Sequence, residues 1–110
     1  MQITYHSELE RDFKRLRRFP APAESLVAWE RLFCLKGLNE TPGIEQYPGF
    51  NQNRIFKARV IPLKEKCGKS KGYRLIFQLL ENEVCLILVF SRHGIYVQEQ
   101  GLIDIIKSRI

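Results

Sequence analysis

The sequence has few of the residues that build disulfide frameworks and metal centres. Its 110 residues include three cysteines and two histidines, and none of them stands at metal-ligand spacing from another. An odd number of scattered cysteines is typical of reduced thiols in the cytoplasm, so neither a disulfide framework nor a zinc site is expected. We expect Cys34 and Cys85 to lie in the core and Cys67 to be an ordinary exposed thiol.

Long hydrophobic runs are also lacking. The longest apolar run, residues 84–90, is far too short to span a bilayer, which takes about 20 residues. The first five residues lead directly into a charged segment, so we expect no signal peptide. Together these features predict a soluble cytoplasmic protein without a membrane partner.

A phosphate-binding loop of the G-x-x-x-x-G-K-[ST] type is excluded as well. Residues 68–70 (Gly-Lys-Ser) match the end of that motif, but Leu63 stands where its first glycine is required. His6 and His93 lie far apart, and each is interpreted as an ordinary hydrogen-bonded histidine. The sequence therefore predicts neither a metal site nor a small-molecule cofactor.

What the sequence does have is a concentration of positive charge. Its formal net charge is +6, and residues 54–74 hold eight bases against one acid, Glu65, which gives this segment a charge of +7. The rest of the chain therefore sums to −1. Such clustering predicts a polyanionic partner such as RNA, and a basic loop that is merely solvated is the alternative. The eight bases are Arg54, Lys57, Arg59, Lys64, Lys66, Lys69, Lys71 and Arg74.

Apolar residues at helical spacing predict three helices. The first is expected to begin at a capping box formed by Ser7 and Glu10. The second is expected to run over residues 23–36 and to stop at Gly37, and it should form an antiparallel hairpin with the first. The third is an amphipathic helix in residues 102–110. The apolar face of the second helix is expected to include Leu26, Val27, Phe33 and Cys34.

A period of two predicts a strand at residues 55–61, and strands are also expected at residues 3–5 and 73–80. Residues 84–90 are apolar on both faces, which predicts a central strand. The last two are joined by the short turn 81–83 and should form a hairpin. The Pro-Gly pairs in residues 41–49 predict a loop, and residues 63–72 are expected to form a lysine-rich loop. The element order is therefore β-α-α-β-β-β-α in one α+β domain, residues 1–110. We expect a mostly antiparallel four-stranded sheet with an N-terminal helical hairpin and a C-terminal helix.

Several bases of the charged segment are expected to share one face of this sheet. Alternation puts Lys57 and Arg59 on the same side of their strand. Arg74 on the neighbouring strand could join them across the sheet, and Arg92, just past the central strand, could form a fourth corner. Cations that converge repel one another unless an anion sits between them. The pattern predicts a phosphate-binding site, and independent solvent-exposed charges are the alternative.

The element order and three segments resemble the RelE/ParE toxin superfamily, above all its RelE- and HigB-like branch. The segments are residues 57–59 (Lys-Ala-Arg), residues 68–77, and the end of the apolar strand at residues 90–92 (Phe-Ser-Arg). The most specific portion is Gly72-Tyr73-Arg74 followed by an apolar strand, a short acidic turn and a second apolar strand. The resemblance covers nearly the whole chain and implies a RelE-like fold.

The resemblance implies the toxin of a type II toxin-antitoxin system, a metal-independent and ribosome-dependent endoribonuclease that cleaves mRNA. By position, Lys57 and Arg59 match strand bases that activate the ribose 2′-hydroxyl and hold the phosphate. Arg74 matches the arginine that stabilises the transition-state charge. Arg92 matches a candidate proton donor, and Tyr96 matches an aromatic residue that stacks on a base. Arg59 stands where the archetype has lysine, and since arginine stays protonated, Lys57 would serve as the general base.

The partners that follow from the resemblance are mRNA, the ribosome and a cognate antitoxin protein. Two other functions remain open, a ParE-like inhibitor of DNA gyrase and a non-catalytic RNA-binding module of the same fold. Further contacts with RNA phosphates are expected from Arg54, Lys64, Lys66, Lys69 and Lys71.

Overall fold

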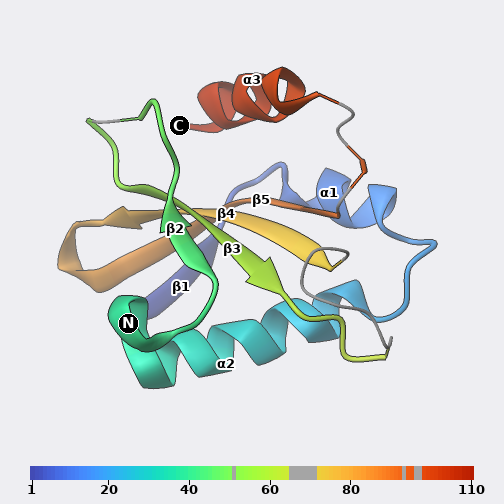
Figure 1. The fold of residues 1–110 in the computed structure, drawn as a ribbon, viewed down its shortest axis with the longest axis horizontal. Helices are drawn as coiled ribbons and strands as arrows, with labels where there is room; N and C mark the ends of the chain where they lie inside the picture. Colours follow the sequence, from blue (N-terminus) through green and yellow to red (C-terminus); the bar gives the residue numbers. More distant parts are fainter. Residues whose placement is uncertain (51, 65–71, 93, 96–97) are drawn as a thin grey trace.

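A mixed sheet organises the chain, and its strands lie in the order β1-β5-β4-β3-β2 (Figure 1). The computed structural model describes residues 1–50, 52–64, 72–92, 94–95 and 98–110, and within these ranges the sheet has five strands. β1 runs parallel to β5, and every other neighbouring pair is antiparallel. The strands are β1 (Gln2–Tyr5), β2 (Ile44–Gln46), β3 (Ile55–Val60), β4 (Tyr73–Leu80) and β5 (Val84–Arg92).

The expected α+β class is confirmed, whereas the predicted sheet is only partly right. β2 lies in the segment that was expected to be a loop, where it pairs with β3 at the edge of the sheet. Three residues between two Pro-Gly turns are too few to show a period, so the strand exists only through its pairing. The hairpin of β4 and β5 is confirmed, and its turn is the 3₁₀ segment Glu81–Glu83.

The helices cover the two faces of the sheet separately (Figure 1). They are α1 (Leu9–Arg15), α2 (Pro22–Glu40) and α3 (Glu99–Arg109). α1 and α2 pack against the face that carries Leu75 and Phe77, and α3 packs against the face that carries Ile55 and Ile76. None of the helices in the described part of the chain is long and apolar enough to cross a membrane.

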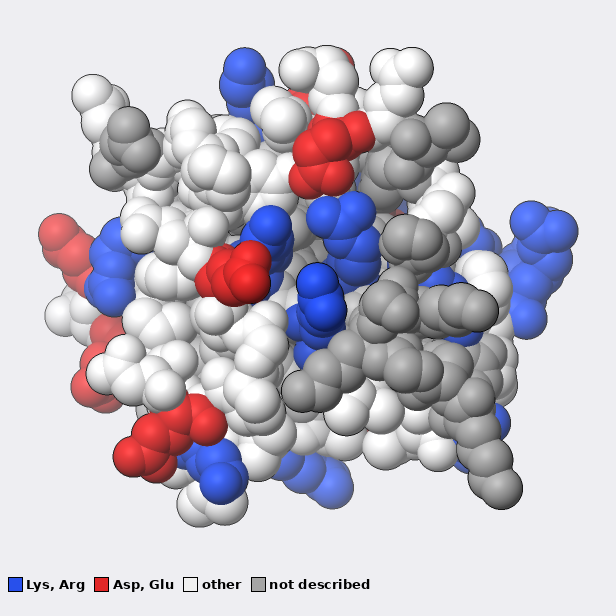
Figure 2. Space-filling model, viewed as in Figure 1, with Lys and Arg blue, Asp and Glu red and all other residues white. Residues whose placement is uncertain are grey.

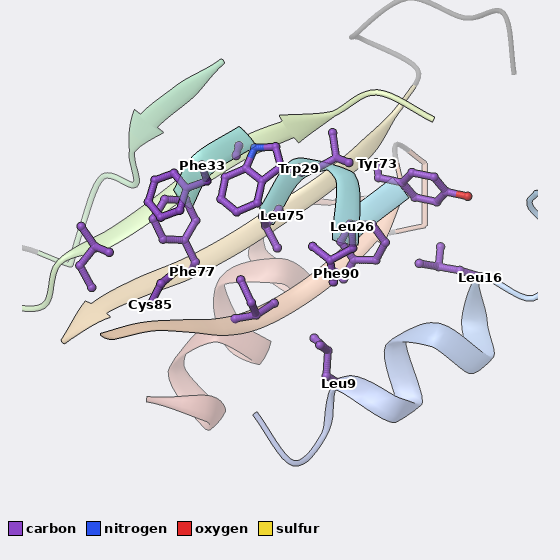
Figure 3. Close-up of a cluster of buried hydrophobic side chains, with 14 residues drawn as sticks. Leu9, Leu16, Leu26, Trp29, Phe33, Tyr73, Leu75, Phe77, Cys85 and Phe90 are labelled. Carbon is purple, nitrogen blue, oxygen red and sulfur yellow. The ribbon is translucent and has the colours of Figure 1, made fainter. Parts of the chain in front are cut away.

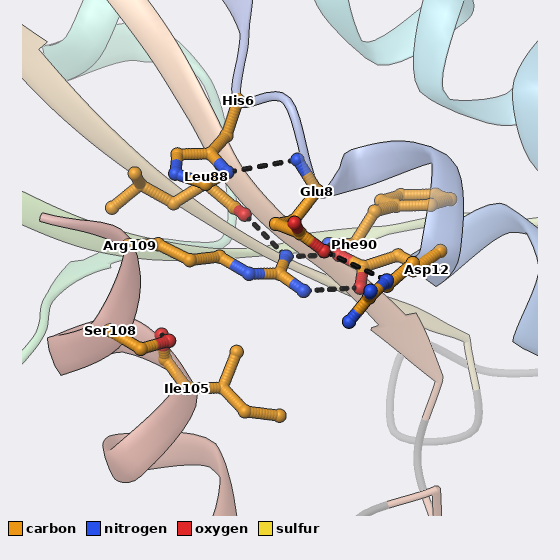
Figure 4. A network of polar contacts seen from close by, with 9 residues as sticks. His6, Glu8, Asp12, Leu88, Phe90, Ile105, Ser108 and Arg109 are labelled. Atoms are coloured by element: carbon orange, nitrogen blue, oxygen red, sulfur yellow. Dashed lines mark hydrogen bonds and ion pairs between the residues drawn. The ribbon is translucent and has the colours of Figure 1, made fainter.

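Two predicted helix boundaries need correction. α1 begins at Leu9 without a side-chain cap, so the expected capping box does not form. Instead, the Glu8 N–H donates a hydrogen bond of 3.0 Å to Nδ1 of His6 (Figure 4). α2 starts as expected but continues past Gly37, whose φ of 78° and ψ of −176° kink the helix before it ends at Glu40. A glycine can adopt this conformation inside a helix, so the residue bends the chain without ending it.

The core on the α1–α2 face is built around three aromatic rings. Trp29 and Phe33 on α2 stack with their ring centroids 4.8 Å apart, and both pack against Phe77 of β4 (Figure 3). Leu26 is buried as expected, but Val27 is 40% exposed because the buried stripe of α2 is narrower than predicted. Cys85 is buried in this core, whereas Cys34 is exposed, which corrects its expected place.

A buried ion pair ties α1, β5 and α3 together (Figure 4). Arg109 donates two hydrogen bonds to the Asp12 carboxylate, at 2.7 and 2.9 Å, and a third to the Leu88 carbonyl at 2.8 Å. The same carboxylate accepts the N–H of Phe90 at 2.9 Å. Side-chain exposure is 7% for Arg109 and 1% for Asp12, so the charges are held almost entirely out of water.

Candidate functional site

Lys57, Arg59 and Arg74 share one face of the sheet and form what we call the cationic cluster. On β3, residues alternate so that Ile55, Lys57 and Arg59 point to the α3 side. Arg59 lies directly opposite Arg74 in the β3–β4 register. Directly opposed side chains have Cβ atoms about 4.5–5.5 Å apart, so two guanidinium groups start from adjacent positions.

The cationic cluster faces solvent on the α3 side of the sheet. Figure 2 shows Lys and Arg side chains gathered in the middle of this view, with acidic groups beside them. The side chains of Lys57 and Arg74 are 37% and 31% exposed, and Arg59 is exposed. The three cations are therefore accessible to a large anionic molecule.

Two carboxylates that sequence reasoning missed lie within the cluster. Glu45 of β2 is the cross-strand partner of Lys57, and its Oε2 lies 3.5 Å from the Lys57 Nζ. Glu99, the first residue of α3, lies 3.5 Å from an Nη of Arg74. In the sequence, Glu45 and Tyr47 stand two residues apart, a spacing that places both side chains on one face if the segment is a strand. No pattern in the sequence singles out Glu99.

Tyr47 connects the two halves of this network. Its hydroxyl donates a short hydrogen bond to Oε1 of Glu99, and Lys57 Nζ lies 5.8 Å from the centre of its ring. This hydrogen bond, assisted by the charge of Arg74, lowers the pKa of Glu99, although burial opposes the shift. Burial and the bond to Glu99 raise the pKa of Tyr47. At neutral pH the network therefore contains an ionised Glu99 and a protonated Tyr47.

The carboxylates relieve the repulsion within the cluster only in part. Glu45 and Glu99 pair with Lys57 and Arg74, while Arg59 has no ion pair among the residues that the structure describes. Solvent-exposed ion pairs contribute only about 0–1 kcal/mol each. A phosphodiester could therefore displace them at small cost and gain the third cation, Arg59.

Arg92 is not brought to the cationic cluster. It ends β5, and its guanidinium lies on the opposite side of the sheet, over the ring of Phe19 at 4.3 Å and that of Tyr73 at 5.1 Å. Tyr73 belongs to the core under α1 and α2, so Arg92 faces away from Arg74. The expected fourth corner is not formed.

Two of the remaining expected RNA-binding residues flank β3. Arg54 precedes β3 and Lys64 follows it, and both are exposed. Lys66, Lys69, Lys71 and Tyr96 lie outside the described residues, as do Cys67 and His93.

No metal-ligand cluster is found among the residues that the structure describes, since no three of their His, Cys, Asp or Glu side chains converge. The polar groups of the site are thus amines, guanidiniums, carboxylates and one phenol. Such a set can hold a phosphate and can move a proton through a carboxylate or an amine. In comparisons with known proteins, no family model, curated protein or solved structure matches this chain.

Proposed function

We propose that the chain is a metal-independent endoribonuclease that cleaves mRNA on the ribosome, as the toxin of a type II toxin-antitoxin system. One observation carries the proposal. Arg59 and Arg74 are cross-strand partners, and Lys57 lies two residues away on the same face. A triad of solvent-accessible cations from two strands suits a phosphodiester, and the sequence features that resemble the RelE- and HigB-like toxins support RNA as its source.

The reaction needs no group beyond the substrate and the protein. A base removes the proton of a ribose 2′-hydroxyl, and the oxygen attacks the adjacent phosphorus. The bond from phosphorus to the 5′-oxygen breaks, which leaves a 2′,3′-cyclic phosphate on one fragment and a 5′-hydroxyl on the other once that oxygen takes up a proton. Charge accumulates on the phosphoryl oxygens in the transition state, where fixed cations are most effective.

The cluster supplies specific groups for these steps. Arg59 and Arg74 would hold the phosphoryl oxygens and stabilise the added charge, because a guanidinium can donate two parallel hydrogen bonds to phosphate. Lys57 and Glu45, 3.5 Å apart, are the two candidates for the group that removes the 2′-proton. Arg92 has no role in this proposal, since its guanidinium lies across the sheet between two aromatic rings.

A non-catalytic RNA-binding domain is the second candidate. The ion pairs of Lys57 with Glu45 and of Arg74 with Glu99 favour it, because cations that stay paired can still contribute to the attraction of RNA phosphates without reaching a reacting phosphoryl group. In that case each lost cation weakens RNA binding by a similar amount and no cutting is seen.

An assay with purified protein and translating ribosomes distinguishes these functions. The ends of the message are mapped, and the chemical groups at those ends are determined. We expect new 5′-hydroxyl ends matched by 2′,3′-cyclic phosphates. Arg74→Ala should lower the cleavage rate by about 100-fold or more, the effect of losing one preorganised charge-stabilising donor. Lys57→Ala and Glu45→Gln should identify the general base, since only the base variant loses the dependence of rate on pH.

Arg31→Ala is the matched control, because Arg31 is an exposed base on α2 away from the cluster. It should leave cleavage unchanged. Intact message with wild-type protein, or full cleavage by Arg74→Ala, would refute the proposal. Intact message together with arrested DNA gyrase would instead support a gyrase inhibitor.

A further inference from the structure

We propose that the end of α1 carries a second polyanion-binding site, which takes the phosphate backbone of single-stranded RNA. The site is a groove of about 580 Å³, which we call the α1 groove. It goes beyond the proposed cleavage, because no residue of the cationic cluster lines it. Its lining is Lys14, Arg15, Arg17, Arg18 and Ile95.

The local sequence concentrates positive charge at this groove. Residues 13–23 contain four bases and no acid. The acid just before them, Asp12, is buried and bound to Arg109. Outside residues 54–74 the charges sum to −1, because acidic residues outside residues 13–23 offset these four bases. The sum therefore conceals a second concentration of bases.

The backbone beneath the basic side chains is firmly held. Leu16 is fully buried, and Phe19 packs against the same core. The Phe19 N–H donates to the Leu16 carbonyl at 2.9 Å, and the Tyr73 hydroxyl donates to the Pro20 carbonyl at 3.0 Å. The turn therefore presents its basic side chains to solvent from a fixed platform. Lys and Arg side chains project from the right-hand edge of the molecule in Figure 2, on the side where the chain leaves α1 in Figure 1.

The helix dipole explains only half of this arrangement. Bases in the last turn of a helix are stabilised by its negative end, and Lys14 and Arg15 occupy that turn. The effect fades beyond the last turn, and Arg17 and Arg18 lie past the C-cap residue Leu16. Like charges held together on a rigid turn repel one another, so an anionic ligand would stabilise the arrangement.

The chemistry of the lining favours nucleic acid over an acidic protein. Protein interfaces are anchored by buried aromatic and aliphatic side chains, whereas Ile95 is the sole apolar residue among the described residues that line the groove. Phosphate backbones are bound by lysine and arginine without such anchors. The arginines of the groove can also donate paired hydrogen bonds to phosphate oxygens.

The test is binding of a fluorescent 2′-O-methyl RNA strand, which cannot be cut by 2′-hydroxyl attack, over a series of salt concentrations. Each phosphate contact with single-stranded nucleic acid contributes about 0.7 to the salt slope. Arg17→Gln with Arg18→Gln should therefore lower the slope by about 1.4 and the affinity at 0.1 M salt by about 25-fold. The control, Arg31→Gln with Lys36→Gln, removes the same charge from exposed positions on α2 and should change the affinity far less.

Equal affinity and slope for the two double variants would overturn the proposal. So would binding of polyglutamate as tight as that of RNA, since the groove would then recognise acidic chains in general. Unchanged thermal unfolding of both variants shows that the fold is retained. The outcome is separate from that of the cleavage assay, because binding at the α1 groove requires neither a 2′-hydroxyl nor the cationic cluster.

Discussion

Removing one partner of the buried Asp12–Arg109 pair should destabilise the fold severely. In Arg109→Ala the Asp12 carboxylate, with 1% side-chain exposure, keeps the hydrogen bond from the Phe90 N–H of β5 but loses its cationic partner. Breaking a buried pair in this way costs about 3–5 kcal/mol, because a charge is left uncompensated away from water. Domains of this size have about 5–15 kcal/mol of stability in all, so the loss is a large fraction of the total.

The measurement is urea unfolding followed by the fluorescence of Trp29, the single tryptophan, which is buried. At a slope of about 1.5 kcal/mol per M urea, the midpoint should fall by about 2–3 M. Arg109→Lys serves if the alanine variant does not fold. It keeps the charge but loses a charge-assisted hydrogen bond, at a cost of about 1.5–3 kcal/mol.

An exposed ion pair at α1, the helix that carries Asp12, provides the matched control. Arg11 lies 3.0 Å from Glu8, with side-chain exposures of 73% and 41%. Arg11→Ala should cost less than about 1 kcal/mol, as exposed pairs do. A cost for Arg109→Ala as small as that of Arg11→Ala would refute the reasoning, since burial would then have no effect on the energy of the pair.

Three further outcomes test other parts of the structure. Because its pKa is lowered, the Glu99 carboxylate stabilises the fold at pH values above the ordinary glutamate pKa of 4.5, and this contribution is lost as pH falls through the lowered pKa. The free energy of urea unfolding at neutral pH should therefore be higher for wild type than for Glu99→Gln, by less than about 1 kcal/mol. A difference that persists in strong acid would contradict this. In a Cys67→Ser background a thiol reagent should label the exposed Cys34 quickly and Cys85 only in urea, because burial raises the pKa of the Cys85 thiol to about 12; equal labelling rates would show that Cys85 is accessible. Gly37→Ala should cost about 1–3 kcal/mol in urea unfolding through backbone strain at φ 78°, although no atom lies within 4 Å of the added Cβ, and an unchanged midpoint would show that the kink is not required.

The features that the sequence predicted well are those set by neighbouring residues. Strands β4 and β5 and their turn follow from apolar runs separated by Glu81–Glu83, and α3 follows from the spacing of its buried Leu102 and Ile106. Lys57 and Arg59 were expected on one face because alternation within a strand is a local property. The bases at the end of α1 also stand together in the sequence, but the charge sum of −1 outside residues 54–74 concealed them.

Pairings between distant segments could not be read in the same way. β2 is too short to show a period, and the parallel pairing of β1 with β5 brings residues 2–5 beside residues 84–87, which are far away in the sequence. The ion pair of Asp12 with Arg109 likewise joins opposite ends of the sequence.

For the candidate site, the order of residues alone put basic side chains at alternate positions of β3 and another on β4. Packing of distant segments then fixed which groups lie beside them. The register of β2 and β3 put Glu45 beside Lys57, and the packing of α3 put Glu99 beside Arg74. Alternation along β5 put Arg92 on the other face of the sheet. The physical reason is that the identity of a side chain fixes its charge, while its electrostatic partners are fixed by contacts that form only when distant segments pack together.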